Sequence, residues 1–204
     1  DVVVCGGGPA GCAAALAAAR HGARTLLIEK DGYLARATVS QLVCVVLSTN
    51  GVDFQGVWHE YARALRRRDA MRPMEGAPSG QIRSCVDPEQ VKFVWDELLS
   101  GAGSALLHHV YGCTCIVENG VAKGVIAETR AGRRAILAGR VIDASGDGIV
   151  AAQSGVEWDQ GDGEHAYAMA LTKVFRLGGL PEEPGRPDDA AMAKIAADLA
   201  SAVA

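Results

Sequence analysis

This sequence has few aromatic residues, no long hydrophobic run and no excess of positive charge. Aromatic residues make up 5% of the 204 residues and hydrophobic residues 49%, so the core has to be built mainly from Ala, Val, Leu and Ile. No stretch of about 18 uninterrupted apolar residues occurs, so no membrane span is expected. The net charge of −4 argues against a nucleic-acid-binding surface, and we interpret the run Arg66–Arg68 as one solvated helix face.

The six cysteines also lack the spacing of a metal site. Cys113 and Cys115 would share one face of a strand, but no second pair and no histidine at a ligand interval accompanies them, so no metal is predicted. Scattered cysteines favour a reduced environment, and we expect a cytoplasmic protein. Cys44 has no second cysteine near it in the sequence, so a pair of cysteines acting as a dithiol relay is not expected there.

The best-defined pattern occupies the first 30 residues. Asp1–Cys5 is a short β-branched run typical of a buried parallel strand, and residues 12–21 have a strongly helix-forming composition. Residues 23–28 predict a second strand, and Glu29 stands at its end. The order is therefore strand, glycine-rich turn, helix, strand and acid.

The glycines and the acid fit the binding of a dinucleotide. Gly6 suits the sharp turn, Gly8 allows backbone to approach a pyrophosphate, and Gly11 lets helix and strand pack closely. Pro9 suits the first helical turn, where the free N–H groups and partial positive charge favour phosphates. Glu29 is placed to accept hydrogen bonds from ribose hydroxyls. A glycine-rich turn that binds nothing is the structural alternative.

The remainder of the chain predicts an α/β fold: a Rossmann-like, three-layer nucleotide-binding domain with a parallel sheet and an antiparallel β-meander. We expect this domain to cover residues 1–160, with the meander at about 112–138, and residues 161–204 to begin an incomplete second domain. The sequence is interpreted as a piece of a longer protein. The expected elements are a strand at 42–47, a helix at 52–68, an exposed loop at 71–81, a helix at 87–99, strands at 104–109, 113–118, 121–128, 133–138 and 140–144, a helix at 149–154, a strand at 167–177, a loop at 181–189 and a helix at 189–204.

Four segments together resemble the FAD-dependent oxidoreductases, and within them the branch related to succinate dehydrogenase and fumarate reductase. They are the first 30 residues, Val86–Leu99 (VDPEQVKFVWDELL), Ile116–Val125 (IVENGVAKGV) and Val141–Gly148 (VIDASGDG). A meander followed by I-D-A-S-G-D-G is not part of a plain NAD-binding domain. The resemblance implies that FAD is the cofactor.

The resemblance also implies which residues bind FAD. The pyrophosphate turn is matched by Gly6, Gly8, Pro9, Ala10 and Gly11. The acid on the adenosine ribose is matched by Glu29, which Lys30 follows, and the backbone contact to adenine by Gly112. The second fingerprint, where the chain turns back against the cofactor, is matched by Ala144, Ser145, Gly146 and Asp147.

Two alternatives stay open for these residues, and the sequence departs from the family pattern at one place. Asp147 could instead cap the helix that follows it. Relatives carry a Gly-Gly pair shortly after the acid, and this sequence has none there. Arg36, in the same stretch, could bridge a phosphate or be an exposed loop residue.

The function predicted is the FAD-binding portion of a flavin-dependent oxidoreductase that transfers hydride or electrons to or from a small organic substrate. No histidine for covalent flavin attachment lies between residues 30 and 50, so we expect FAD to be bound non-covalently. No catalytic residue and no redox partner can be named, because the flavin itself supplies the redox chemistry. The alternatives are an NAD-binding dehydrogenase domain and a non-catalytic nucleotide-binding fragment.

Overall fold

The computed structural model describes residues 1–48, 55–74 and 82–159, and beyond these only residues 161, 172, 174, 194 and 197. The chain divides into two compact units, Asp1–Thr172 and Lys173–Ala204. The three described segments all belong to the first unit. The strand predicted at 167–177, the loop at 181–189 and the helix at 189–204 fall almost entirely outside the described residues, and the domain boundary near residue 160 stays a prediction.

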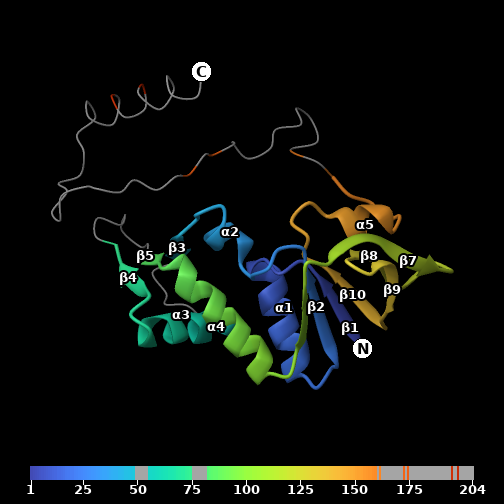
Figure 1. The fold of residues 1–204 in the computed structure, drawn as a ribbon, viewed down its shortest axis with the longest axis horizontal. Helices are drawn as coiled ribbons and strands as arrows, with labels where there is room; N and C mark the ends of the chain where they lie inside the picture. Colours follow the sequence, from blue (N-terminus) through green and yellow to red (C-terminus); the bar gives the residue numbers. More distant parts are fainter. Residues whose placement is uncertain are drawn as a thin grey trace. The chain divides into compact units, whose positions relative to one another are not determined.

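A four-stranded parallel sheet lies at the centre of the first unit. Its strands are β1 (Val2–Cys5), β2 (Thr25–Glu29), β6 (Ala105–His108) and β10 (Arg140–Asp143), in the order β10-β1-β2-β6 (Figure 1). All three pairings are parallel, so the carboxyl ends of the four strands meet at one edge of the sheet. The predicted α/β fold with a parallel sheet is confirmed.

Helices cover one face of this sheet. α1 (Pro9–Arg20) and α4 (Pro88–Gly101) pack on it, and α3 (Val57–Arg67) packs in turn against α4. α4 begins where the sequence predicts, because the Asp87 carboxylate accepts a hydrogen bond from the Glu89 N–H at 2.8 Å and proline occupies the first turn. The helix predicted at 52–68 begins at Val57 as α3; residues 55 and 56 are not helical, and residues 52–54 lie outside the described residues.

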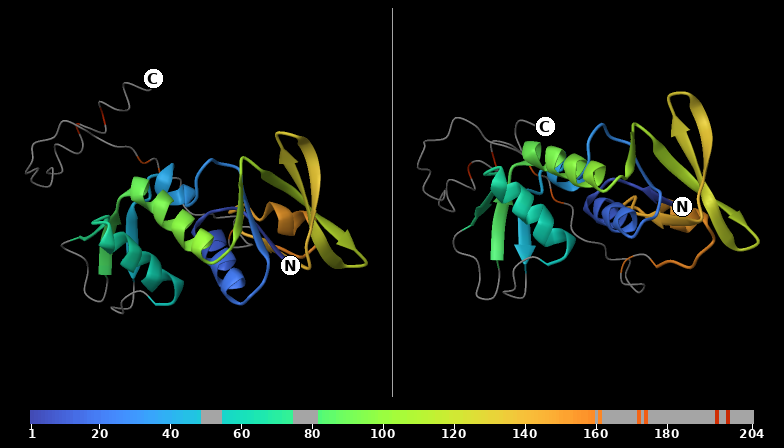
Figure 2. Two further views of the ribbon diagram at one scale, coloured as in Figure 1. Left: turned by 60° about the horizontal axis from the view of Figure 1, so that its bottom comes forward. Right: turned by 90° about the horizontal axis from the view of Figure 1, so that it is seen from below.

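The antiparallel β-meander covers the opposite face of the sheet. It consists of β7 (Tyr111–Glu118), β8 (Val121–Thr129) and β9 (Gly132–Leu137), followed after β10 by the short helix α5 (Ile149–Gln153) (Figure 2). Asn119 and Gly120 both have positive φ, 53° and 74°, as a tight two-residue hairpin turn requires. Alternate residues of β1 pack on the two faces, since Val4 faces the helices and Val3 faces the meander.

A second antiparallel sheet corrects the start of the loop predicted at 71–81, because residues 71–73 form a strand, whereas residues 75–81 lie outside the described residues. Its strands are β3 (Val45–Ser48), β5 (Ile82–Val86) and β4 (Met71–Pro73), in the order β3-β5-β4. Met71 pairs with Val86 and both side chains are buried, so this segment is held by a strand distant in sequence. A short helix, α2 (Arg36–Val39), which was not predicted, precedes β3.

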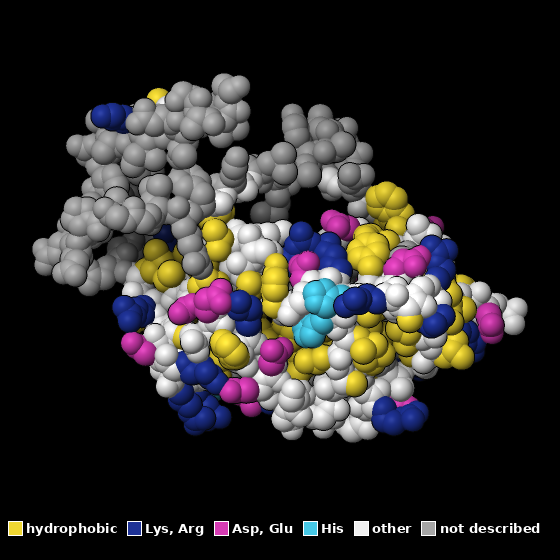
Figure 3. Space-filling view, in the orientation of Figure 1, with side chains coloured by type: hydrophobic (Ala, Val, Ile, Leu, Met, Phe, Trp, Pro, Cys, Tyr) yellow, Lys and Arg dark blue, Asp and Glu magenta, His cyan; other side chains and the backbone are white. Residues whose placement is uncertain are grey.

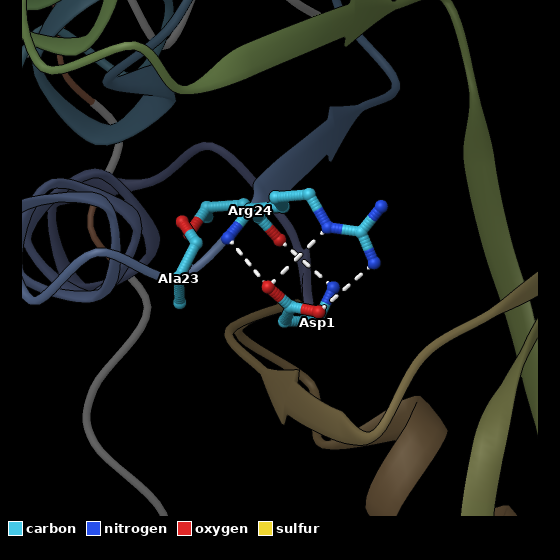
Figure 4. A network of polar contacts seen from close by, with 4 residues as sticks. Asp1, Ala23 and Arg24 are labelled. Carbon is cyan, nitrogen blue, oxygen red and sulfur yellow. Dashed lines mark hydrogen bonds and ion pairs between the residues drawn. The ribbon is translucent and has the colours of Figure 1, made fainter.

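Polar contacts tie the amino ends of β1 and β2 together. The Asp1 carboxylate accepts hydrogen bonds from the Arg24 backbone N–H at 2.9 Å and from its guanidinium at 3.0 Å (Figure 4). This pair lies at the edge of the sheet opposite to the carboxyl ends of the strands.

Charged side chains of both signs are interspersed over the surface. On the face shown in Figure 3, groups of basic and acidic side chains alternate among apolar ones. Arg20 pairs with Glu60 at 2.6 Å, which links α1 to α3. Within the part of the chain that the structure describes, no helix combines the length and the apolar character that crossing a membrane requires.

Candidate cofactor site

The turn after β1 is packed so tightly that two of its glycines are structural requirements. Gly6 has φ of +105°, and a Cβ atom there would collide with the carbonyl of Ala144. A Cβ atom on Gly11 would collide with the Gly6 carbonyl. The predicted roles of Gly6 in the turn and of Gly11 in close helix packing agree with this geometry, and the contact brings Ala144 beside both glycines.

Gly8 differs from them because it has free space around it. No atom lies within 4 Å of where its Cβ would be, and its backbone is extended, with φ of −66° and ψ of 175°. Any residue can adopt that conformation. Pro9 follows at the first position of α1, as predicted, and the amides of Ala10 and Gly11 belong to the helical turn whose N–H groups lack partners within the helix. The fold itself therefore does not require glycine at position 8.

The Glu29 carboxylate is held rigidly at the end of β2. The side chain is 4% exposed, and its two oxygens accept hydrogen bonds from the Gly7 N–H at 2.5 Å and the Asp31 N–H at 2.8 Å. A Cβ atom on Gly7 would lie 2.5 Å from the Leu34 side chain and 3.0 Å from the Glu29 carboxylate. Sequence reasoning missed Gly7, although three consecutive glycines, one more than the motif needs, are a signal for it. A carboxylate has about four acceptor positions, so Glu29 retains capacity for ribose hydroxyls.

The second turn, after β10, is organised by Asp143. Its carboxylate accepts hydrogen bonds from the Ser145 N–H at 2.9 Å and the Ala151 N–H at 2.7 Å, and the Ser145 hydroxyl accepts one from the Ile149 N–H at 3.2 Å. Partial burial alone would raise the pKa of Asp143, but these hydrogen bonds from Ser145 and the α5 backbone outweigh it and lower the pKa. Sequence reasoning missed Asp143 as well.

These contacts bear on the alternative role of Asp147. The N-cap position of α5 is Gly148, with φ of 65°, and no side chain hydrogen-bonds there as a cap. The N–H groups of Ile149 and Ala151 are served by Ser145 and Asp143 instead. The interpretation of Asp147 as a helix cap is therefore wrong.

One pocket at the carboxyl ends of β1, β2 and β10 brings together six of the predicted residues. They are Gly6, Glu29, Lys30, Gly112, Ser145 and Asp147. The other lining residues are Cys5, Ile28, Val110, Tyr111 and Ile149. Gly8, Pro9, Ala10, Gly11, Ala144 and Gly146 belong to the two turns beside the pocket and do not line it.

Arg36 does not line this pocket. It begins α2, and its Nε lies 3.5 Å from the Asp31 carboxylate, an ion-pair distance without hydrogen-bond geometry. Arg36 is thus an ion-pair partner of Asp31, two residues beyond Glu29. The strand predicted at 104–109 would include both His108 and His109, but β6 ends at His108, and His109 has φ of 57°. A ring nitrogen of His108 lies 3.1 Å from the Asp31 carbonyl oxygen.

The cysteines of the region are buried and neutral. Burial, aided by the charge of Asp143, raises the pKa of the Cys5 thiol to about 12. Burial likewise raises the pKa of Cys12, whose thiol donates a hydrogen bond to the Gly7 carbonyl at 3.2 Å. Neither thiol provides a nucleophile at neutral pH. No group of side chains able to hold a metal ion occurs among residues 1–48, 55–74 and 82–159.

Comparison with known protein families identifies this combination of turns, sheet and meander. The model of the family described as FAD dependent oxidoreductase matches residues 1–202. The chain belongs to this family. FAD is therefore its cofactor, as predicted, and the alternative of an NAD-binding domain is not supported. No curated protein matches the sequence.

Solved structures of similar fold are distant in sequence. A geranylgeranyl bacteriochlorophyll reductase-like protein of Thermoplasma acidophilum is 24% identical with a TM-score of 0.61, covering 77% of this chain and 42% of its own. The p-nitrophenol 4-monooxygenase PnpA of Pseudomonas putida is 16% identical with a TM-score of 0.56, covering 78% and 44%. THI4 of Thermovibrio ammonificans is 19% identical with a TM-score of 0.54, covering 75% and 60%. At these identities the likeness shows the fold, and the chain spans less than two thirds of each of these proteins.

The residues present fit FAD. Gly8 leaves open the space that a side chain would fill, beside the free amides at the start of α1. The buried carboxylate of Glu29 lies between this turn and the apolar floor of the pocket. The diphosphate of FAD would thus meet the free amides of α1, the ribose the Glu29 carboxylate, and the base the apolar floor of the pocket.

Proposed function

We propose that this chain is the FAD-binding portion of an oxidoreductase that transfers hydride or electrons to or from a small organic substrate. The observation that carries the proposal is the pocket at the carboxyl ends of β1, β2 and β10, where Gly6, Glu29, Gly112 and Asp147 converge. Ligands of open α/β sheets bind at this edge of the strands. The finer placement, in the branch related to succinate dehydrogenase and fumarate reductase, rests on the four sequence segments that resemble it.

The roles of the individual residues follow from their positions. The Gly8 backbone and the first turn of α1 would bind the diphosphate, Glu29 the ribose, and the backbone at Gly112 the adenine. The turn from Ala144 to Asp147, which includes Ser145 and Gly146, would line the path toward the flavin. Bound flavin supplies the redox chemistry, and the protein positions it and excludes water.

Substitution at Gly8 tests the cofactor site without disturbing the fold. Gly8→Val places a side chain in space that is empty in the structure, so we expect normal folding and loss of FAD binding by the full-length protein. Gly101→Val is the matched control, because Gly101 is the exposed last residue of α4, also with open space around its Cβ. Isothermal titration with FAD measures the difference. Equal FAD affinity of wild type and Gly8→Val would contradict the site.

A second measurement separates an enzyme from a non-catalytic nucleotide-binding module. The full-length protein, loaded with FAD, is screened anaerobically against organic donors while the visible absorbance of the flavin is followed. Bleaching by a small organic donor, or reoxidation of the reduced protein by an organic acceptor, supports the oxidoreductase. Tight FAD binding without either reaction supports the module.

A further inference from the structure

One wall of the pocket is formed by a side chain that the sequence did not single out. Tyr111, the first residue of β7, lines the pocket together with Lys30, the residue after β2. The Lys30 ammonium lies 5.7 Å from the centroid of the Tyr111 ring, a cation–π distance. Tyr111 is 40% exposed, so part of its ring surface is accessible to a ligand.

The backbone on both sides of Tyr111 is fixed against the parallel sheet. On one side, the Val110 N–H donates a hydrogen bond to the Glu29 carbonyl at 2.9 Å. On the other, a Cβ atom on Gly112 would lie 3.2 Å from the Ile28 side chain and 3.3 Å from the Cys5 sulfur. Tyr111 is therefore presented beside the pocket by a rigid segment.

The remaining lining of the pocket selects a particular kind of group. The buried side chains of Cys5, Ile28 and Val110 form an apolar floor, and the Cys5 thiol is neutral because burial raises its pKa to about 12. The Glu29 carboxylate adjoins this floor as an acceptor for hydroxyl groups. An apolar floor, an aromatic wall and an adjoining carboxylate together suit a flat aromatic base attached to a sugar.

We infer that the Tyr111 ring is the stacking surface for the adenine base of FAD. The inference rests on the proposed function, because it names the side chain of the same site that contacts the base. Stacking of a base on an aromatic ring depends on the ring face and not on the hydroxyl group, so phenylalanine can replace tyrosine. Flavin mononucleotide (FMN) lacks the adenosine part, so Tyr111 does not contribute to its binding affinity.

The experiment compares three ligands on the full-length protein freed of cofactor. Dissociation constants for FAD, ADP and FMN are measured by isothermal titration. Tyr111→Ala weakens FAD and ADP by the same factor, about 5- to 100-fold, and leaves FMN unchanged. Tyr111→Phe stays within about twofold of wild type for all three, because it retains the ring face.

Tyr33→Ala is the matched control. Lys92 lies over the Tyr33 ring at 5.9 Å, which is the same kind of pair, and Tyr33 does not line the pocket. We expect Tyr33→Ala to leave the affinities for FAD and ADP unchanged. If Tyr111→Ala does not fold by circular dichroism, Tyr111→Leu, which keeps the bulk without the aromatic face, shows the same selective loss.

The outcomes separate this inference from the proposed function. Unchanged FAD affinity in Tyr111→Ala, with wild type still binding FAD, overturns the stacking role alone. An equal loss of FMN, FAD and ADP affinity also overturns it, because the effect then does not concern the base. A wild-type protein that binds neither FAD nor ADP overturns the proposed function and the inference together.

Discussion

At the scale of single residues, Glu29 has two tasks that are easily confused. Its carboxylate holds the Gly7 and Asp31 N–H groups and faces the pocket. Because the side chain is almost fully buried, its loss leaves two backbone donors without their partner. The effect of substituting Glu29 on FAD affinity therefore has to be compared with its effect on the free energy of unfolding.

Glu29→Ala is expected to affect both quantities. We expect FAD binding to weaken by about 1–3 kcal/mol and the free energy of unfolding without FAD to fall by a similar amount, since each loss removes hydrogen bonds to a charged group. Titration with FAD and urea unfolding measure the two separately. A variant with unaltered stability would show that the bonds to Gly7 and Asp31 contribute nothing, and one with unaltered affinity would remove the ribose role.

Asp143 gives a prediction about pH. Its hydrogen bonds to Ser145 and Ala151 lower its pKa, so the stability they contribute is fully present above the pKa of the unfolded chain, about 3.9, and is lost as pH falls through the lower folded pKa. The difference in unfolding free energy between wild type and Asp143→Asn is thus constant above about pH 5 and shrinks below about pH 4. Urea unfolding across this range measures it, and a difference that grows toward acid would contradict the hydrogen-bond assignment.

At the scale of elements, the packing of α1 on the turn after β1 is the least tolerant contact. A Cβ atom on Gly11 would collide with the Gly6 carbonyl, which is backbone and cannot rotate away. Gly11→Ala is therefore expected to destabilise the protein by about 1–3 kcal/mol or more, despite the better helix propensity of alanine. Urea unfolding of Gly11→Ala beside Gly101→Ala tests this. If the two variants had equal free energies of unfolding, α1 could move away from the Gly6 carbonyl without loss of stability.

The elements also show what sequence reasoning can and cannot supply. The unit from β1 to Glu29 was predicted because its signals are local: β-branched runs, spaced glycines and a proline at the helix start. The strands β4 and β5 were missed because Met71 and Val86 are paired across the chain and buried by tertiary contacts. For the same reason Gly7, Tyr111 and Asp143 were missed, since each acts through contacts to distant backbone or across the pocket.

At the scale of the whole molecule, the way in which FAD is retained can be tested directly. We expect FAD to be bound non-covalently, so acid precipitation of the full-length protein should leave the yellow cofactor in the supernatant. Saturating FAD at about 100 times its dissociation constant should stabilise the native protein by about 2.7 kcal/mol. Thermal unfolding with and without FAD measures this. Colour that stays with the precipitated protein would show a covalent link.

The order of strands in the parallel sheet has a consequence for synthesis of the protein. Of the four strands of this sheet, β1 is synthesised before the others, yet one of its two neighbours is β10, where Val2 pairs with Arg140. Until residues 140–147 have emerged, one edge of β1 is unpaired and the second turn against the glycines does not exist. The nascent chain therefore cannot capture its cofactor before most of this segment has been translated, and pairing over such a sequence distance is slow. Newly made protein should acquire its yellow colour only after this late step.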